Sequence, residues 1–257
     1  MCLVLFGVKV SQSLPFILAS NRDEFYQRPT AAMNFWPENP AILAGKDLEH
    51  GGTWFGLHTR GRFAALTNYR DLSRVKPRAP SRGDIIPTFL EFNGSIPNFL
   101  ERLKSKSLDY NGFNLLAGDG HTLYWFSNRN QTITRVAPGI HGLSNHLMDT
   151  PWPKVSAGKT ALARAMDANT LDPATLFCLL SDTSRPPDAN LPDTGVGKEW
   201  EKILSPLFIQ SPSYGTRSSI VMGITSQGQI QVTERTYFPD RTTPYTDRNF
   251  SLFPGDC

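Results

Sequence analysis

Short apolar runs separated by polar turns dominate the start of the chain and predict β-strands. Residues 2–10 form an apolar, β-branched run that favours a buried strand over a helix. Residues 11–14 resemble a hairpin turn, and residues 15–19 form a second apolar run. Two adjacent strands would bring the polar side chains of Asn21-Arg22-Asp23, just past the second strand, close to Cys2.

The following residues predict a loop and then a hairpin. Residues 25–40 are rich in aromatics and prolines and are predicted to form an ordered loop, followed by a short apolar piece at 41–45. Residues 53–59 and 62–68 give the clearest hairpin of the chain. They are joined by Arg60-Gly61, where glycine suits a tight turn.

Helical patterns appear in the middle of the chain. Residues 81–92 combine a capping Ser81 with an apolar face and predict an amphipathic helix, in which Pro87 is unfavourable. Further helices are predicted at 96–103, 151–165 and 173–180.

Strand patterns return later, at 113–117, 122–126, 132–136, 218–225 and 229–234. Residues 182–197 are predicted to be a surface loop, and the polar tail from Asp240 is predicted to be mobile. Strands, helices and strands again favour segregated layers over an alternating βαβ fold. Since no linker is apparent, residues 1–257 are predicted to form a single α+β domain.

Composition narrows the possible functions. Of 257 residues 39% are hydrophobic and 19% charged, which is typical of a globular protein, and the formal net charge is only +3. The densest basic stretch, 70–82, is interrupted by Pro77 and Pro80 and lacks stacking aromatics. We interpret it as a solvated loop and expect no nucleic-acid partner.

Cysteine usage and hydropathy indicate a reducing compartment. Cys2, Cys178 and Cys257 fit neither a metal site nor a disulfide framework. No apolar run approaches the length of a transmembrane span, and the first strand is a poor signal peptide. We therefore expect a cytoplasmic protein.

Cys2 is the first candidate for chemistry. Removal of Met1 would leave a terminal thiol and a free α-amine on one residue, and that amine has a pKa near 8, low enough to act as a base. The alternative is that Cys2 is a small buried hydrophobe.

Four polar residues close apolar runs and supply what a terminal thiol needs: Asp23, Asn68, Asn145 and Arg217. Asparagine amides can donate to an oxyanion, and a carboxylate and a guanidinium can orient the thiol and amine. Taken singly, each residue could instead be a cap, a turn residue or a surface ion-pair partner.

Several segments carry a family resemblance. Asn21-Arg22-Asp23-Glu24 is the signature after which the NRDE family is named. Other matching segments are Gly51-Gly52-Thr53-Trp54-Phe55-Gly56, Ala64-Ala65-Leu66-Thr67-Asn68-Tyr69, Tyr110-Asn111-Gly112-Phe113-Asn114-Leu115, Gly142-Leu143-Ser144-Asn145, Thr150-Pro151-Trp152-Pro153-Lys154 and Tyr214-Gly215-Thr216-Arg217. The chain resembles this family, the transport-and-Golgi-organisation-2-like proteins, over most of its length.

The resemblance implies a four-layer αββα sandwich of the N-terminal nucleophile (Ntn) hydrolase type. Its catalytic relatives look like choloylglycine hydrolases and penicillin acylases, in which a terminal Cys attacks an amide. Carried over, Cys2 is the nucleophile, Asp23 and Arg217 orient it, and Asn68 with Asn145 stabilises the oxyanion. Those hydrolases carry an Arg where this chain has Ser20; Arg22 lies nearby, but its side chain is expected on the other face of the strand.

The resemblance also implies a second function, because the family has been linked to haem movement, lipid homeostasis and secretory organisation. The candidate ligand-binding residues are Arg22, Trp36, Trp54 and Tyr69. The candidate axial haem ligands are His50, His58, His121, His141 and His146. Two hypotheses follow: a hydrolase or acyltransferase that acts on an amide and needs no cofactor, and a non-catalytic carrier of haem or an acyl lipid. The oligomeric state stays open.

Overall fold

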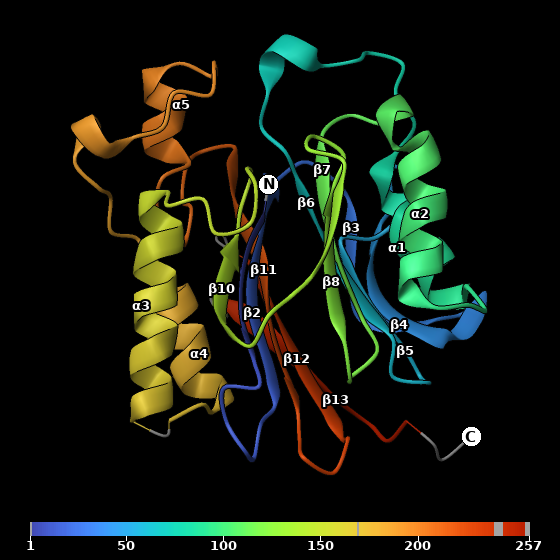
Figure 1. Ribbon diagram of the computed structural model, residues 1–257. Coiled ribbons are helices and arrows are strands. Elements are labelled where there is room, and N and C mark those ends of the chain that lie inside the picture. Colours follow the sequence, from blue (N-terminus) through green and yellow to red (C-terminus); the bar gives the residue numbers. More distant parts are fainter. Residues whose placement is uncertain (1, 169, 239–243, 255–257) are drawn as a thin grey trace.

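Two antiparallel β-sheets lie face to face at the centre of the structure, and helices cover the outer face of each, as Figure 1 shows. The structure is a computed structural model that describes residues 2–168, 170–238 and 244–254; the side chain of Cys2 lies outside the described part. Helix, sheet, sheet and helix layers follow one another in space. This arrangement confirms the predicted four-layer αββα sandwich.

The first sheet has the strand order β10-β1-β2-β11-β12-β13. Its strands are β1 (Cys2–Val8), β2 (Phe16–Phe25), β10 (Gly139–Leu143), β11 (Tyr214–Ile224), β12 (Ile230–Tyr237) and β13 (Tyr245–Leu252). Helices α3 (Pro153–Asp167) and α4 (Pro173–Leu180) pack on its outer face. The short helix α5 (Lys198–Ile203) lies at one end of this half.

The second sheet runs β3-β4-β5-β6-β7-β8-β9 in simple sequence order. Its strands are β3 (Thr30–Trp36), β4 (Asn39–Asp47), β5 (Phe55–His58), β6 (Phe63–Asn68), β7 (Phe113–Gly118), β8 (Leu123–Ser127) and β9 (Thr132–Arg135). Helices α1 (Ile85–Glu91) and α2 (Ile96–Lys106) cover its outer face. Four 3₁₀ turns complete the described structure: η1 (Leu72–Arg74), η2 (Arg82–Asp84), η3 (Ser107–Asp109) and η4 (Asp188–Asn190).

Side-chain alternation along β1 shows why the first sheet needs the second sheet on one face and a layer of helices on the other. Val4 and Phe6 pack between the sheets, whereas Leu3 and Leu5 pack against α3 and α4. Each of these side chains is almost completely buried, which stabilises the fold by about 1.5–3 kcal/mol per residue. By the same alternation, the polar residues of β2 are divided between the space between the sheets and the layer of helices.

The predicted hairpin and most predicted helices are confirmed. β5 and β6 pair antiparallel, and Gly61 adopts a φ of +90° in the turn between them. Ser81 caps the 3₁₀ turn η2, since its Oγ accepts from the Gly83 N–H, and α1 begins only at Ile85. Pro87 therefore lies in the first turn of α1, where its missing N–H costs nothing.

Other elements differ from the predictions. Residues 25–40 were predicted as a loop, but they contain β3 and the start of β4. These strands are edge-proximal in the sheet and tolerate the prolines, which lie outside β3 or near the start of β4. The tail from Asp240 was predicted to be mobile, yet its residues 245–252 form β13, paired along β12. Helix α5 was not predicted at all, because it is short and follows a Pro- and Asp-rich segment.

No helix in the described ranges is long and apolar enough to cross a membrane.

Candidate functional site

A cavity of about 650 Å³ lies at the end of the sandwich where β2 and β6 end. Among its lining residues are Arg22 and Asp23 from β2, Trp54 before β5 and Asn68 at the end of β6. Backbone register pairs Cys2 with Arg22, so the first residue of β1 lies directly opposite a residue of this cavity. The predicted proximity of Asp23 and Arg22 to the start of β1 is thus confirmed for the backbone, whereas the predicted thiol position falls outside the described residues.

β2 is longer than predicted, and this changes how its polar residues are presented. It continues to Phe25, so Asn21, Arg22 and Asp23 lie within the strand and not after it. Because strand side chains alternate, Arg22 points between the sheets and its two neighbours point toward the helix layer.

Arg22 is buried without a full set of partners. Its side chain is 93% buried, its guanidinium carbon lies 4.0 Å from the centre of the Trp54 ring, and its Nη2 is 4.0 Å from a carboxylate oxygen of Glu24. Its Nη1 has no hydrogen-bond partner among the described residues, and neither does the buried Nε1 of Trp54. Such donors are costly to bury, so this pair is an incompletely satisfied part of the cavity wall.

The strand face predicted for Arg22 was wrong. Ser20 pairs with Val4 and Arg22 with Cys2, and positions two apart on a strand share a face. Arg22 therefore projects from the same face as Ser20, the position where the resembling hydrolases carry their arginine. It lies two residue pairs further along, opposite the first residue of β1.

Asp23 is held rigidly on the other face of β2. Its Oδ1 accepts a hydrogen bond of 2.7 Å from the Thr216 hydroxyl, and its carbonyl accepts from the Tyr214 hydroxyl. Burial raises the pKa of this carboxyl, while the nearby Lys154 ammonium and the bond from Thr216 oppose the rise. Asp23 is thus a fixed, buried acid at the edge of the cavity, as an orienting residue would need to be.

Asn68 and Asn145 are close together, but their amides are used differently. Asn68 is half-buried and lines the cavity. Asn145 is completely buried; its Nδ2 donates to the Asn68 carbonyl over 2.9 Å, and its own carbonyl accepts from the Arg70 backbone N–H. Asn145 therefore fixes the end of β6, and of the two amides only that of Asn68 is among the residues that line the cavity.

Arg217 stabilises a chain turn. It sits at a β-bulge of β11, and its Nη1 donates to the carbonyls of Phe25, Tyr26 and Arg28. Burial lowers the pKa of Arg217, and the positive charge of Arg22 lowers it further. Arg217 thus lies beside the cavity residues and shapes the segment after β2, without appearing among the residues that line the cavity.

The predicted ligand-binding aromatics separate into two groups. Trp54 lines the main cavity, and Tyr69 lines an adjoining hollow of about 210 Å³ that shares Asn68 with it. The assignment of Trp36 was wrong: it packs under α1 in the outer core of the second sheet, and its Nε1 donates to the Ala44 carbonyl. A proline-flanked segment had suggested a loop, but β3 carries this side chain into the helix layer.

The candidate axial histidines are also dispersed. His50 lines the main cavity and is exposed. The ring of His58 accepts from the Arg60 backbone N–H, that of His141 bonds Asp149, and that of His146 bonds Thr150. His121 lies beside a different hollow. Only His50 of the five therefore reaches the cavity among its described lining residues.

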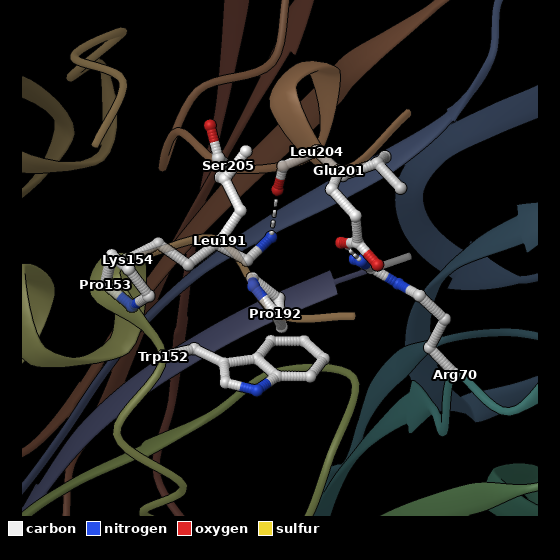
Figure 2. Close-up of a pocket in the computed structure, with 9 residues that line it drawn as sticks. All are labelled: Arg70, Trp152, Pro153, Lys154, Leu191, Pro192, Glu201, Leu204 and Ser205. Carbon is white, nitrogen blue, oxygen red and sulfur yellow. Dashed lines mark hydrogen bonds and ion pairs between the residues drawn. The ribbon is translucent and has the colours of Figure 1, made fainter. Parts of the chain in front are cut away.

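A buried ion pair behind Asp23 was missed from the sequence. Figure 2 shows Arg70 facing Glu201, with an Nη1–Oε2 distance of 2.7 Å and both side chains only 4% exposed. Lys154, also in this view, donates to the Leu204 carbonyl. The prediction of a solvated loop over 70–82 is correct for 72–78 but wrong for Arg70, which is buried. The signal available in the sequence was the position of Arg70, two residues after Asn68 at the end of β6.

Gly52 and Gly83 allow two segments of the cavity wall to approach closely. A Cβ on Gly52 would lie 2.4 Å from the backbone of Gly83, and the Thr53 N–H donates to the Gly83 carbonyl. Only glycine permits this approach, which joins the segment before β5 to η2 along the cavity.

Comparison with known proteins agrees with this architecture. The chain is 36% identical to the Transport and Golgi organization protein 2 homolog of Bos taurus, covering 91% of this chain and 92% of that protein. It is 33% identical to the Homo sapiens homolog, covering 98% and 99%, and 29% identical to the Drosophila melanogaster protein.

Solved structures with the same fold are conjugated bile acid hydrolases from Clostridium perfringens. A mutant of that enzyme matches with a TM-score of 0.54 and 10% identity, covering 97% of this chain and 92% of the enzyme. A second variant matches with a TM-score of 0.52 and 11% identity. At such low identity the likeness establishes the fold alone, which is that of the Ntn hydrolases.

The family model for Transport and Golgi organisation 2 matches residues 1–239. The motifs that carried the resemblance, from the Asn21-Arg22-Asp23-Glu24 strand to the Arg217 bulge, lie within that range. The chain belongs to the Transport and Golgi organisation 2 family.

Proposed function

We propose that the protein is an N-terminal-cysteine hydrolase or acyltransferase that acts on a carbon–nitrogen amide bond, with Cys2 as its nucleophile. One observation carries the proposal: β1 begins opposite Arg22, at a polar cavity of about 650 Å³ that Asp23 and Asn68 also line. Its fold is shared with enzymes named as hydrolases.

In this proposal each residue has a defined task. Once Met1 is removed, the α-amine of Cys2 takes the thiol proton while the sulfur attacks the amide carbonyl carbon. The Asn68 amide donates to the oxyanion that forms, and Asn145 holds the end of β6 in place. Collapse of the intermediate breaks the C–N bond, and the leaving amine takes the proton. Water or a second amine then cleaves the thioester.

Arg22 and Asp23 support these steps from opposite faces of β2. The positive charge of Arg22 favours the thiolate, since a nearby guanidinium lowers a thiol pKa. Asp23 and Arg217 orient the α-amine and the chain around it, because Asp23 is fixed by Thr216 and Arg217 by three carbonyls. No cofactor enters this reaction.

The test begins with the terminus. Intact mass should show that Met1 is absent from the mature protein, and an electrophilic acyl probe should then label Cys2. The chain has two other cysteines, Cys257 and the exposed Cys178. The assay therefore uses a background in which both are changed to Ser, and there Cys2→Ala should abolish labelling. Asp23→Asn should lower the labelling rate without removing the thiol. Retention of Met1, or equal labelling of the Cys2→Ala variant, would refute the proposal.

A second candidate function, a haem or acyl-lipid carrier, is favoured by a different observation. Asn145 and Arg217, two of the predicted catalytic groups, are already engaged in structural hydrogen bonds. Against haem as the ligand, the polar lining of the cavity, which includes Arg28, Asp47 and Arg82, suits a flat apolar macrocycle less well than a polar substrate.

A haem titration separates the two functions. A saturable shift of the Soret band would favour the carrier. Loss of that shift in Cys2→Ala alone or in His50→Ala alone would identify the changed residue as the haem ligand. The hydrolase proposal instead expects no saturable binding and a reactive Cys2.

A further inference from the structure

Three exposed aliphatic side chains gather beside the candidate site. Leu72 and Val75 are 53% and 55% exposed, and Leu108 is 62% exposed. The Lys76 ammonium bonds the Leu108 carbonyl and the Lys76 backbone N–H bonds the Asn111 side chain, which ties the two segments together. Large aliphatic groups this exposed are costly in water when they cluster, and clusters of this kind mark interaction surfaces.

Cations surround these side chains. The segment 71–82 contains four basic residues and one acidic residue, and Arg74, Lys76 and Arg78 are all exposed. Arg74 is 3.6 Å from Asp71, a surface pair that leaves its guanidinium mostly in water. Lys104 and Lys106 at the end of α2 add to the positive charge, and Asp109 opposes it. The surface therefore combines apolar tips with a net positive rim.

This surface borders the entrance to the cavity. Leu72 and Val75 line the smaller hollow, while Ala79, Pro80 and Ser81 line the main cavity. Arg82 and Asn111 line both. Figure 1 shows the segment after β6, coloured teal, arching over the same end of the molecule as α5. A partner that contacts this segment will therefore also lie next to the cavity.

We propose that residues 71–81 together with Leu108 dock the protein onto an anionic lipid surface, with the cavity facing that surface. Exposed leucine and valine tips flanked by arginine and lysine match the chemistry of an anionic bilayer, where apolar groups enter the acyl boundary and cations meet the headgroups. An acidic protein partner fits less well, because binding energy at protein interfaces concentrates in Trp, Tyr and Arg, with Leu and Val under-represented. This inference is independent of the proposed reaction.

The test is vesicle co-sedimentation of the full chain. We expect binding to vesicles of phosphatidylcholine mixed with phosphatidylserine and none to phosphatidylcholine alone, with binding lost at high salt. Arg74, Lys76 and Arg78 changed together to Gln should weaken binding on the order of a hundredfold, about fivefold for each cation. Leu72, Val75 and Leu108 changed together to Ser should weaken it at least tenfold.

Matched controls come from the opposite end of the strands. Lys9, Arg60 and Arg135 changed together to Gln remove the same charge at exposed positions: Lys9 and Arg60 follow β1 and β5, and Arg135 is the last residue of β9. Phe253→Ser removes a side chain of equal exposure, 54%, whose neighbour Pro254 packs at Gly61. Neither control should change binding by more than about twofold.

A second measurement does not depend on the variants. Amide hydrogen exchange in residues 72–78 should slow when phosphatidylserine vesicles are added to the wild-type protein. Failure of the wild type to bind these vesicles would overturn the proposal, as would equal weakening by the control variants. Retention on polyglutamate without retention on vesicles would assign the surface to an acidic protein and would also overturn it. Cys2 labelling by a soluble probe should be unchanged in all these variants, which keeps this test separate from that of the reaction.

Discussion

Two buried arginines near the same end of the sandwich differ in how they are satisfied. Arg70 is paired with Glu201, also donates to Asn145, and lies 5.1 Å from the Trp152 ring, in a region with almost no free volume. Arg22 stacks on Trp54 but leaves Nη1 without a partner in the described chain, beside a cavity of about 650 Å³. The two arginines are similarly buried but differ in their partners: Arg70 joins separate elements through an ion pair, whereas Arg22 keeps an unsatisfied donor next to the cavity.

The largest expected effect comes from breaking the Arg70 pair. Glu201→Ala should lower the free energy of unfolding by about 3–5 kcal/mol, because it leaves a buried guanidinium uncompensated. It also frees the Thr194 N–H and hydroxyl, which both bond Glu201. Urea denaturation measures the loss. The double variant Arg70→Met with Glu201→Leu is the control and should recover most of the stability. A loss below about 1 kcal/mol for Glu201→Ala would mean that the pair is no structural clamp.

Arg22→Met should have a smaller effect on stability and a larger one on chemistry. The lost stacking on Trp54 costs up to about 2 kcal/mol, and removal of an unpartnered donor returns part of that cost. We expect a net loss of about 1 kcal/mol by urea denaturation, together with a roughly tenfold slower labelling of Cys2. Arg102→Met, which removes an exposed stacking arginine on Phe92, is the matched control and should change neither quantity. A loss as large as that of Glu201→Ala would erase the contrast between the two arginines.

The sequence predicted the layers better than the individual strands. Hydrophobic periodicity located β1, β5, β6 and most helices, because each buries one clear face. It failed for β3, β4 and β13, where aromatic, proline-rich or polar stretches become strands through pairing with neighbours. Such pairing is a tertiary effect that local patterns do not encode.

For the site, sequence reasoning identified residues but not their partners. Asp23, Asn68 and Trp54 line one cavity. Arg22 lies on the same face of β2 as Ser20 and not on the opposite face as predicted, because positions two apart on a strand share a face. The Arg70–Glu201 pair was invisible, since its two members are far apart in the chain and each looks like a surface charge. Trp36 was predicted to bind a ligand, but the pairing of β3 with β4 places it in the outer core of the second sheet.

Asp149 and its two partners, His141 and Lys159, are only partly buried and test how far the contrast between the two arginines depends on burial. Asp149 accepts from His141 over 2.7 Å and from Lys159 over 2.6 Å. Burial raises the pKa of Asp149, but these bonds hold it at about 2, below the ordinary 3.8, and the Asp149 bond raises the pKa of His141 above its ordinary 6.5. The stabilisation from Asp149 is therefore present above pH 3.8 and lost as the pH falls through about 2, while that from His141 is present below pH 6.5 and lost as the pH rises through its raised pKa.

Asp149→Asn should accordingly lose about 1 kcal/mol at most, a value reduced because solvent screens both groups. Asparagine suits the position, since residue 149 has a φ of +59°. The difference from wild type should be largest between the ordinary pKa values of 3.8 and 6.5, as measured by urea denaturation at a series of pH values. A pH-independent difference would mean that the ion pair contributes nothing and that only packing was changed.

The smallest expected effect has the opposite sign and concerns the Arg22 region. Glu234 is 1% exposed; its Oε2 accepts from the Met33 N–H, and its Oε1 has no partner among the described residues. Burial raises the pKa of Glu234 above the ordinary 4.5, so its contribution to stability is present below pH 4.5 and is lost as the pH rises through the raised pKa. Glu234→Gln removes this loss and should gain somewhat less than about 1 kcal/mol at neutral pH, and nothing in acid.

Urea denaturation at acid and neutral pH measures this gain, with the exposed Glu101→Gln on α2 as the control that should stay flat. A gain would mean that the Arg22 region keeps an acid that the fold alone does not need, which is the mark of a site retained for binding or chemistry. If Glu234→Gln instead destabilises at neutral pH, Glu234 is ionised and compensates the charge of Arg22. The two arginines would then both be structural, each with its own buried carboxylate.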